Sequence, residues 1–270
     1  MSTTTTSPSA TLAPPVALAP TVGFRRLMQA EARKMVDTRS GRWLVIIIVA
    51  LALAGAGLGI SIYPSLAGRI GPHWHDTLLE FTLAGASVLI PVMAILAVCS
   101  EWTQRTALIT FTIEPRRARV SAAKAVVMWL FATVCWLMVI ALTAAATTVA
   151  AGIADMKIDW TTDWSSLVGA YLAFLLTVIS AFAIALLLQH PAAAIVILLG
   201  VPLVASGLSA FGGTIGTVIA WTDLQSAAAP LTTSLSLTGM QVARLVSASA
   251  IWIIAPICIG LWRQSVTEPQ

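Results

Sequence analysis

The stretch AVVMWLFATVCWLMVIALTAAATTVAAGIA, residues 125–154, contains no Asp, Glu, Lys, Arg or His. The hydrocarbon core of a bilayer is about 30 Å thick, and a helix of about 20 apolar residues crosses it. A barrel strand would alternate apolar and polar residues over about ten positions, and this stretch does not alternate. It therefore predicts a helix that spans a membrane.

Working outward from this stretch, five more apolar runs without ionisable residues have a similar length. They are residues 43–62, 81–99, 167–188, 192–211 and 245–262. The whole chain is 58% hydrophobic and 10% charged with a mean hydropathy of +0.91, whereas soluble proteins average about 25% charged residues. We therefore expect an all-α, polytopic membrane protein whose transmembrane domain, residues 43–262, has six spans. Spans without charge offer no proton or ion relay, so the energy for moving a solute would come from a partner.

Lys and Arg are retained on the cytoplasmic side of membrane proteins. With the N-terminus inside and six crossings, the inner segments carry twelve of the fifteen basic residues, and the outer ones carry only Arg69, Lys157 and Arg244. Both termini are therefore expected in the cytoplasm. The net charge of +4 then reflects topology, and we expect no nucleic-acid partner because the arginines flank spans.

The segments at the two ends differ from the spans. Residues 1–20 are rich in Thr, Ser, Ala and Pro, which predicts a disordered cytoplasmic tail. Residues 263–270 are expected to be a short cytoplasmic tail. Residues 21–42 predict an amphipathic helix at the inner membrane interface, with Phe24, Leu27, Met28 and Met35 near one side and Glu31 interrupting them. Its basic side chains would reach anionic lipid head groups. A simple positive topological anchor is an equally good interpretation.

The fifth apolar run is broken by Pro202 and by glycines, which are tolerated in a span where neighbouring protein or a cavity supplies hydrogen-bond partners. Residues 212–244 are too interrupted for another pair of crossings. We expect an outer re-entrant region with short helices near 215–223 and 237–244, which would form an outer gate or only cover the bundle.

Other candidate sites are weak. Three isolated cysteines inside spans, Cys99, Cys135 and Cys258, indicate packing rather than disulfides. Only two histidines, His73 and His75, flank Trp74, too few for a metal site. A serine protease pairing of His190 with Ser206 or Ser209 would need residues at opposite ends of one span to meet.

The charged insert between the second and third spans, residues 100–124, carries the most specific pattern. Glu101 and Arg105 are four apart and can pair on a helix, and Ser100 could cap its first turn. Pro115 disfavours helical geometry in Glu114 and would end it. The prediction is a short amphipathic helix at about 100–115 whose apolar side enters a groove on another protein. An ordinary positively charged loop is the alternative.

The insert resembles the motif that follows the second span in permeases of the ABC type-2 transporter family. The resemblance lies in Ser100-Glu101 with Thr106, in Phe111-Thr112 with Pro115, and in Arg119 and Lys124. The layout is similar as well: an N-terminal interfacial helix, six spans and an outer re-entrant region before the last one.

The resemblance implies that the helix after the second span is a coupling helix, which docks into a cytoplasmic P-loop ATPase, and that two permease copies assemble with two ATPases. The residues at or near this contact would be Glu101, Arg105, Thr106, Glu114, Pro115 and Arg119. The turn at residues 189–191 would be a minor second contact. No Walker A motif precedes any of the three lysines. We therefore expect no enzyme activity and no cofactor in this chain, with ATP and magnesium held by the partner in a bacterial inner membrane.

Three function classes remain at this point. The first is a permease that exports a hydrophobic drug, a peptide antibiotic or a lipid-like solute. A wall for such a solute could come from aromatic residues of the third and fourth spans, namely Trp129, Phe131, Trp136, Phe174 and Phe182, although aromatic residues in spans more often face lipid or pack against neighbours. The second is a membrane scaffold or sensor whose basic insert binds a regulator. The third is a secondary transporter, which the absence of charged spans and of internal repeats disfavours.

Overall fold

The computed structural model describes residues 23–66, 78–103, 117–155, 157 and 160–266. Within these ranges all regular secondary structure is helical. Among the described residues, six helices are long and apolar enough to cross a membrane. This confirms the predicted all-α fold and the prediction of six apolar helices of spanning length.

The observed helices match the predicted spans to within a few residues at most ends. The largest differences are N-terminal extensions of eight residues in the third span and six in the last. The long helices are α2 (Arg39–Leu66), α3 (Leu78–Thr103), α5 (Arg117–Ala154), α6 (Trp164–Leu188), α7 (Pro191–Ser209) and the continuous α10 (Gly239–Ser249), η2 (Ala250–Ile254) and α11 (Ala255–Val266). Segment η2 is a π-helix just before Pro256, whose ring nitrogen cannot donate to the carbonyl of Trp252.

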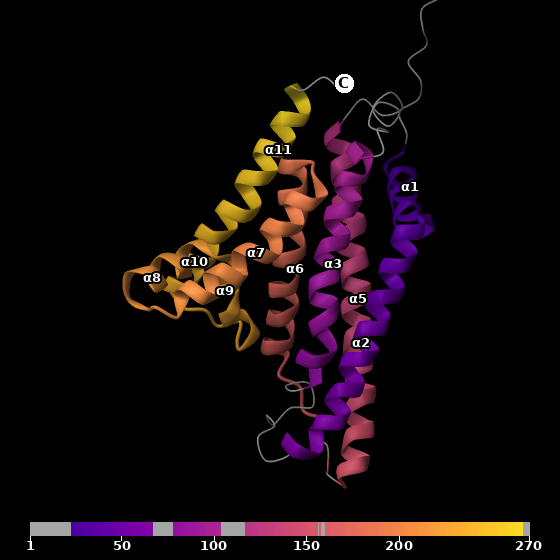
Figure 1. Cartoon of the computed structure of the whole chain (residues 1–270), viewed down its shortest axis with the longest axis vertical. Coiled ribbons are helices and arrows are strands. Elements are labelled where there is room, and N and C mark those ends of the chain that lie inside the picture. The colour runs from indigo at the N-terminus through magenta and orange to yellow at the C-terminus, as the bar shows by residue number, and fades with distance from the viewer. Residues whose placement is uncertain (1–22, 67–77, 104–116, 156, 158–159, 267–270) are drawn as a thin grey trace, which may run out of the picture.

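Helices α2, α3 and α5 run side by side, and α6 packs against α3 and α5 (Figure 1). The core between them is apolar, with fully buried side chains such as Ile90, Ile95, Met128 and Leu186. Close approach is possible at Gly55, where an added Cβ would lie 2.1 Å from the carbonyl oxygen of Phe81. The bundle is therefore held by side-chain packing, as expected for spans without interhelical charge.

Between α7 and α11 the chain forms a group of short helices, which we call the α8–α10 segment (residues 213–249). It contains α8 (Gly213–Thr222), α9 (Leu224–Ala228), the 3-10 helix η1 (Ala229–Thr232) and α10. In Figure 1 these helices lie beside the middle of the long helices, not beyond their ends. The two predicted short helices correspond to α8 and to the start of α10. However, α10 continues directly into the last span, and α9 with η1 was not predicted.

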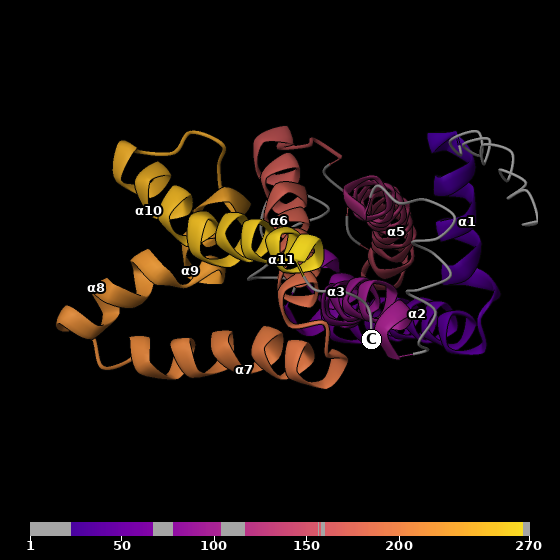
Figure 2. The ribbon, with the colours of Figure 1, turned by 90° about the horizontal axis from the view of Figure 1, so that it is seen from above.

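The first described helix, α1 (Phe24–Asp37), crosses the direction of the spans. Seen from above, α3 and α5 are viewed along their axes while α1 is viewed from its side (Figure 2). Helix α1 packs against α5 and α2. We refer to the end of the bundle that carries α1 as the α1 end.

Candidate functional site

The structure describes only part of the predicted docking segment. Glu101 lies in the last turn of α3, with its side chain outside the described set, and Arg119 lies half-buried in the first turn of α5. Arg105, Thr106, Glu114 and Pro115 lie outside the described residues. The predicted coupling helix therefore stays a prediction.

One detail of that prediction is wrong: Ser100 does not begin a new helix. Helix α3 continues without a break through Ser100 to Thr103, and the Ser100 hydroxyl donates a hydrogen bond to the carbonyl oxygen of Ala97 across 3.0 Å. Inside a helix a serine hydroxyl can donate to the carbonyl oxygen of the preceding turn in this way. The second span thus extends directly into the start of the insert.

Three parts of the chain lie at the α1 end of the bundle. They are α1 itself, the end of α3 with the start of α5, and the turn between α6 and α7 (Figure 1). Two contact points with a partner were predicted, and both are at this end. The end of α3 and the start of α5, which flank the first of them, lie here, and so does the second, the turn at residues 189–191. A partner protein at this end could reach them together.

At this end a buried ion pair joins α1 to α5. The ammonium group of Lys124 donates to Oε2 of Glu31 across 2.5 Å, and Lys34 donates to Oε1 across 2.7 Å. Glu31 is 4% exposed and Lys124 is 6% exposed. Both carboxylate oxygens therefore have a cationic partner, which is the condition under which a buried carboxylate is tolerated.

Burial disfavours the charged form of Glu31, and the positive charges and hydrogen bonds of Lys124 and Lys34 outweigh this effect. The pKa of Glu31 is therefore held below its ordinary value. Glu31 stays ionised near neutral pH, so the link between α1 and α5 is an ion pair under physiological conditions.

The apolar surroundings of this pair explain why Glu31 faces inward. Leu27 of α1 packs with Val120 and Ala123 of α5, and Met35 of α1 joins the main core. Glu31 lies on the same side as Leu27 and Met35, one turn from each. In the sequence Glu31 interrupts the apolar side of the helix. In the structure the positive charge of Lys124 stabilises the Glu31 carboxylate at this buried position. The sequence signal that could have found this pair is Lys124 itself, the single lysine at the start of an apolar helix.

The α6–α7 turn is held by its own contacts. Gln189 has a left-handed backbone with a φ of 55°, and Nδ1 of His190 accepts a hydrogen bond from the backbone N–H of Ala193 at 3.4 Å. Arg263 near the end of α11 donates to the carbonyl oxygen of Leu187 across 3.1 Å. His190 thus has a capping role, and α11 ends beside this turn at the α1 end.

Most of the aromatic residues that could form a wall for a solute are part of the buried core. The rings of Trp136 and Phe174 stack with centroids 5.6 Å apart, and Tyr171 packs against Trp136 at 5.7 Å. Trp136, Phe174 and Phe182 are buried, and Trp129 is exposed on the outside of α5. Trp136, Tyr171 and Phe174 therefore stabilise the packing of α5 on α6.

A buried acid lies between α8 and α9. Asp223 is 5% exposed, and its Oδ2 accepts a hydrogen bond from the backbone N–H of Ser226 across 2.8 Å. It is the N-cap of α9. In the part of the chain that the structure describes, no three His, Cys, Asp or Glu side chains are grouped as a metal ion would require.

Comparison with protein-family models, curated proteins and solved structures finds no match to this chain.

Proposed function

We propose that this chain is the membrane permease subunit of an ATP-driven ABC exporter in a bacterial inner membrane. Two copies would form the translocation path, and a separate cytoplasmic P-loop ATPase would bind ATP and magnesium. The α1 end would face the cytoplasm, where the basic residues are concentrated.

The observation that carries the proposal is that α1, the end of α3, the start of α5 and the α6–α7 turn all lie at one end of the bundle. The sequence between α3 and α5 carries the family-like motif, and this sequence returns into α5 seven residues before Lys124. A partner that moves this segment would act directly on α5 and, through the Glu31–Lys124 pair, on α1.

In this mechanism ATP binding closes the two ATPase subunits, and the docked segments follow them. The permease dimer then opens an outward path along the interface of its spans. ATP can shift this equilibrium only through contacts that differ between the two conformations. The charged and apolar sides of the docking segment would provide those contacts.

The test is purification of the tagged protein from its native host in mild detergent, followed by identification of bound chains and an ATPase assay. We expect a stoichiometric P-loop ATPase that is lost when Glu101 and Arg105 are both replaced by Ala. Membrane insertion should be unchanged in this variant. Recovery of a regulatory protein in place of an ATPase would support the scaffold or sensor function.

A further inference from the structure

A cavity of about 300 Å³ lies between α3, α6 and α7, with α9 and η1 on one side. Its volume is at the lower limit for small-molecule sites in proteins, about 300 Å³. The apolar part of its wall comes from Leu83, Val88 and Pro91 of α3, Ala170, Ala173 and Phe174 of α6, and Leu198, Leu199 and Pro202 of α7. Pro202 is the residue that marked the fifth run as irregular in the sequence.

The cavity is open to the surroundings of the bundle. Val88 and Leu199 both line it, and each is 43% exposed. They belong to α3 and α7, two of the helices apolar enough to cross a membrane. A molecule dissolved in the bilayer could therefore enter between these two helices without passing through water.

The polar groups that line this cavity carry no charge. The hydroxyls of Ser87, Thr177 and Thr232 each donate to a carbonyl oxygen of their own helix or turn, so that their oxygens can still accept a hydrogen bond. Gln225 is exposed and lines both the cavity and the smaller hollow beside it. Its amide can both donate and accept hydrogen bonds, so a hydroxyl or amide group of a ligand could bond to it.

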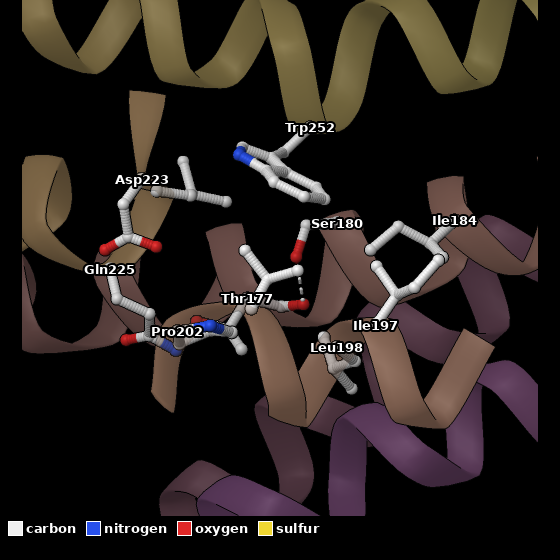
Figure 3. Close-up of a pocket in the computed structure, with 11 residues that line it drawn as sticks. Thr177, Ser180, Ile184, Ile197, Leu198, Pro202, Asp223, Gln225 and Trp252 are labelled. Carbon is white, nitrogen blue, oxygen red and sulfur yellow. Dashed lines mark hydrogen bonds between the residues drawn. The ribbon is translucent and has the colours of Figure 1, made fainter. Parts of the chain in front are cut away.

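A smaller hollow of about 30 Å³ adjoins the cavity and shares Thr177, Leu198, Pro202 and Gln225 with it. Figure 3 shows Asp223 and Gln225 on one side of this hollow and the ring of Trp252 above it. The indole N–H of Trp252 donates to the carbonyl oxygen of Thr222 across 2.7 Å, and Asp223 caps α9. The hollow has the size of about one water molecule, so it has room for one small polar group.

From these observations we propose that the cavity binds an uncharged amphiphile that enters from the bilayer. Its apolar body lies against α3, α6 and α7, and its hydroxyl or amide group bonds to Gln225 at the small hollow. An anionic head group is disfavoured because, among the described residues, no basic residue lines the cavity or the small hollow and Asp223 lies at the hollow, and burial of an unpaired charge is costly. A trimethylammonium head group is disfavoured by its size, because the hollow has room for only about one water molecule. As a substrate site the cavity depends on the proposed exporter function, but as a binding site it does not.

The experiment uses the full-length protein in phosphatidylcholine nanodiscs and decylglycerol carrying a photoactivatable diazirine in its chain. Peptides that become labelled are identified by mass spectrometry, with excess unlabelled decylglycerol as competitor. We expect saturable labelling of the α3, α6 and α7 segments that line the cavity. Decanoate and decyltrimethylammonium probes with the same diazirine should label these segments at least about tenfold less, which is 1.4 kcal/mol of discrimination.

Three variants test the location. Ala173→Phe and Ser87→Phe fill the cavity from two different helices and should abolish saturable labelling, whereas the matched change Ala141→Phe on the exposed side of α5 should not. Gln225→Leu should weaken decylglycerol binding about tenfold, the effect of one lost hydrogen bond. Size-exclusion chromatography checks that each variant remains monodisperse.

Labelling that excess decylglycerol does not compete away, or equal labelling by the charged probes, would overturn the proposal. So would unchanged labelling in a folded Ala173→Phe or Ser87→Phe protein. Failure of the exporter function would appear in a different measurement, as absence of an ATPase from the purified protein, and would leave the binding result intact.

Discussion

Glu31 and Lys124 are 93 positions apart in the chain, and their side chains meet in a buried ion pair at the α1 end of the bundle. Lys124 is seven residues from the start of α5, and Glu31 is in the middle of α1. The pair therefore ties α1, which lies across the bundle, to the span that follows the predicted docking segment. It gives α1 a fixed position relative to α5.

Replacement of Glu31 by Gln should lower the stability of the protein strongly. The change removes the buried negative charge to which Lys124 donates, and loss of one partner of a buried pair costs about 3 to 5 kcal/mol. Thermal unfolding of the detergent-solubilised protein should show a clearly lower midpoint. The matched control is Asp37→Asn, an exposed acid on the same helix, which should leave the midpoint nearly unchanged. Equal midpoints for the two variants would contradict this account of the pair.

The same pair predicts a dependence of stability on pH. The pKa of Glu31 is lowered in the folded protein from an ordinary value of 4.5, so the folded state binds a proton less readily than the unfolded state. The stabilisation is complete above this value and is lost as the pH falls from 4.5 through the lowered pKa. The difference in unfolding midpoint between the wild type and Glu31→Gln should therefore shrink below pH 4.5. A difference that stays constant down to strongly acidic pH would show that ionisation of Glu31 contributes nothing.

Gly169 sets the position of η1 on α6. A Cβ at this position would lie 1.8 Å from the carbonyl oxygen of Leu231, so Gly169→Ala should push η1 away and destabilise the protein. Gly152→Ala in α5 is the control because a Cβ there meets no atom within 4 Å, and Ala is favoured over Gly in a helix by about 1 kcal/mol.

The displacement of η1 can be measured with a cysteine pair at Ser165 and Leu235. The Ser165 hydroxyl accepts a hydrogen bond from the backbone N–H of Leu235 across 2.8 Å, so the two positions are neighbours. We expect a short bifunctional reagent to cross-link the pair in the wild-type background and in Gly152→Ala, and to do so much less in Gly169→Ala. Undiminished cross-linking in Gly169→Ala would show that the contact at Leu231 is not needed.

The orientation of the bundle can be tested by cysteine labelling. After replacement of Cys99, Cys135 and Cys258, single cysteines are introduced at Arg33 in α1 and at Lys157 between α5 and α6, two exposed positions. A membrane-impermeant maleimide added to intact cells or spheroplasts should label position 157 alone and label position 33 only after the membrane is permeabilised. The reverse pattern would place α1 on the outer face and remove the basis for a cytoplasmic partner there.

The spans could be predicted from the sequence because the bilayer requires each of them to be long, apolar and helical by itself. Each signal is therefore local, and all six runs were found with small errors at most of their ends. The α8–α10 segment was found in part because residues 212–244 are too interrupted by glycines for another pair of crossings. Its continuity with the last span depends on the π-helix at Ala250–Ile254, which has no comparable sequence signal.

The features that were not predicted depend on contacts between distant residues. In the sequence Glu31 only interrupts the apolar side of an amphipathic helix, because its partner Lys124 is in another helix. Ser100 looked like a helix start because serine is common at N-caps, but α3 simply continues through it. The cavity depends on which sides of α3, α6 and α7 face one another, and three helices with nearly uniform apolar composition do not specify this in their sequence.

The central claim is that a cytoplasmic ATPase drives this protein through the segment between α3 and α5. The most direct measurement is purification of the tagged protein from its native host, with an ATPase assay of the purified complex. The account predicts a P-loop ATPase in equal amount in the wild type, and its loss in Glu101→Ala/Arg105→Ala while the variant still inserts in the membrane. Recovery of the wild-type protein without any ATPase in several mild detergents, or full retention of the ATPase by the variant, would contradict it.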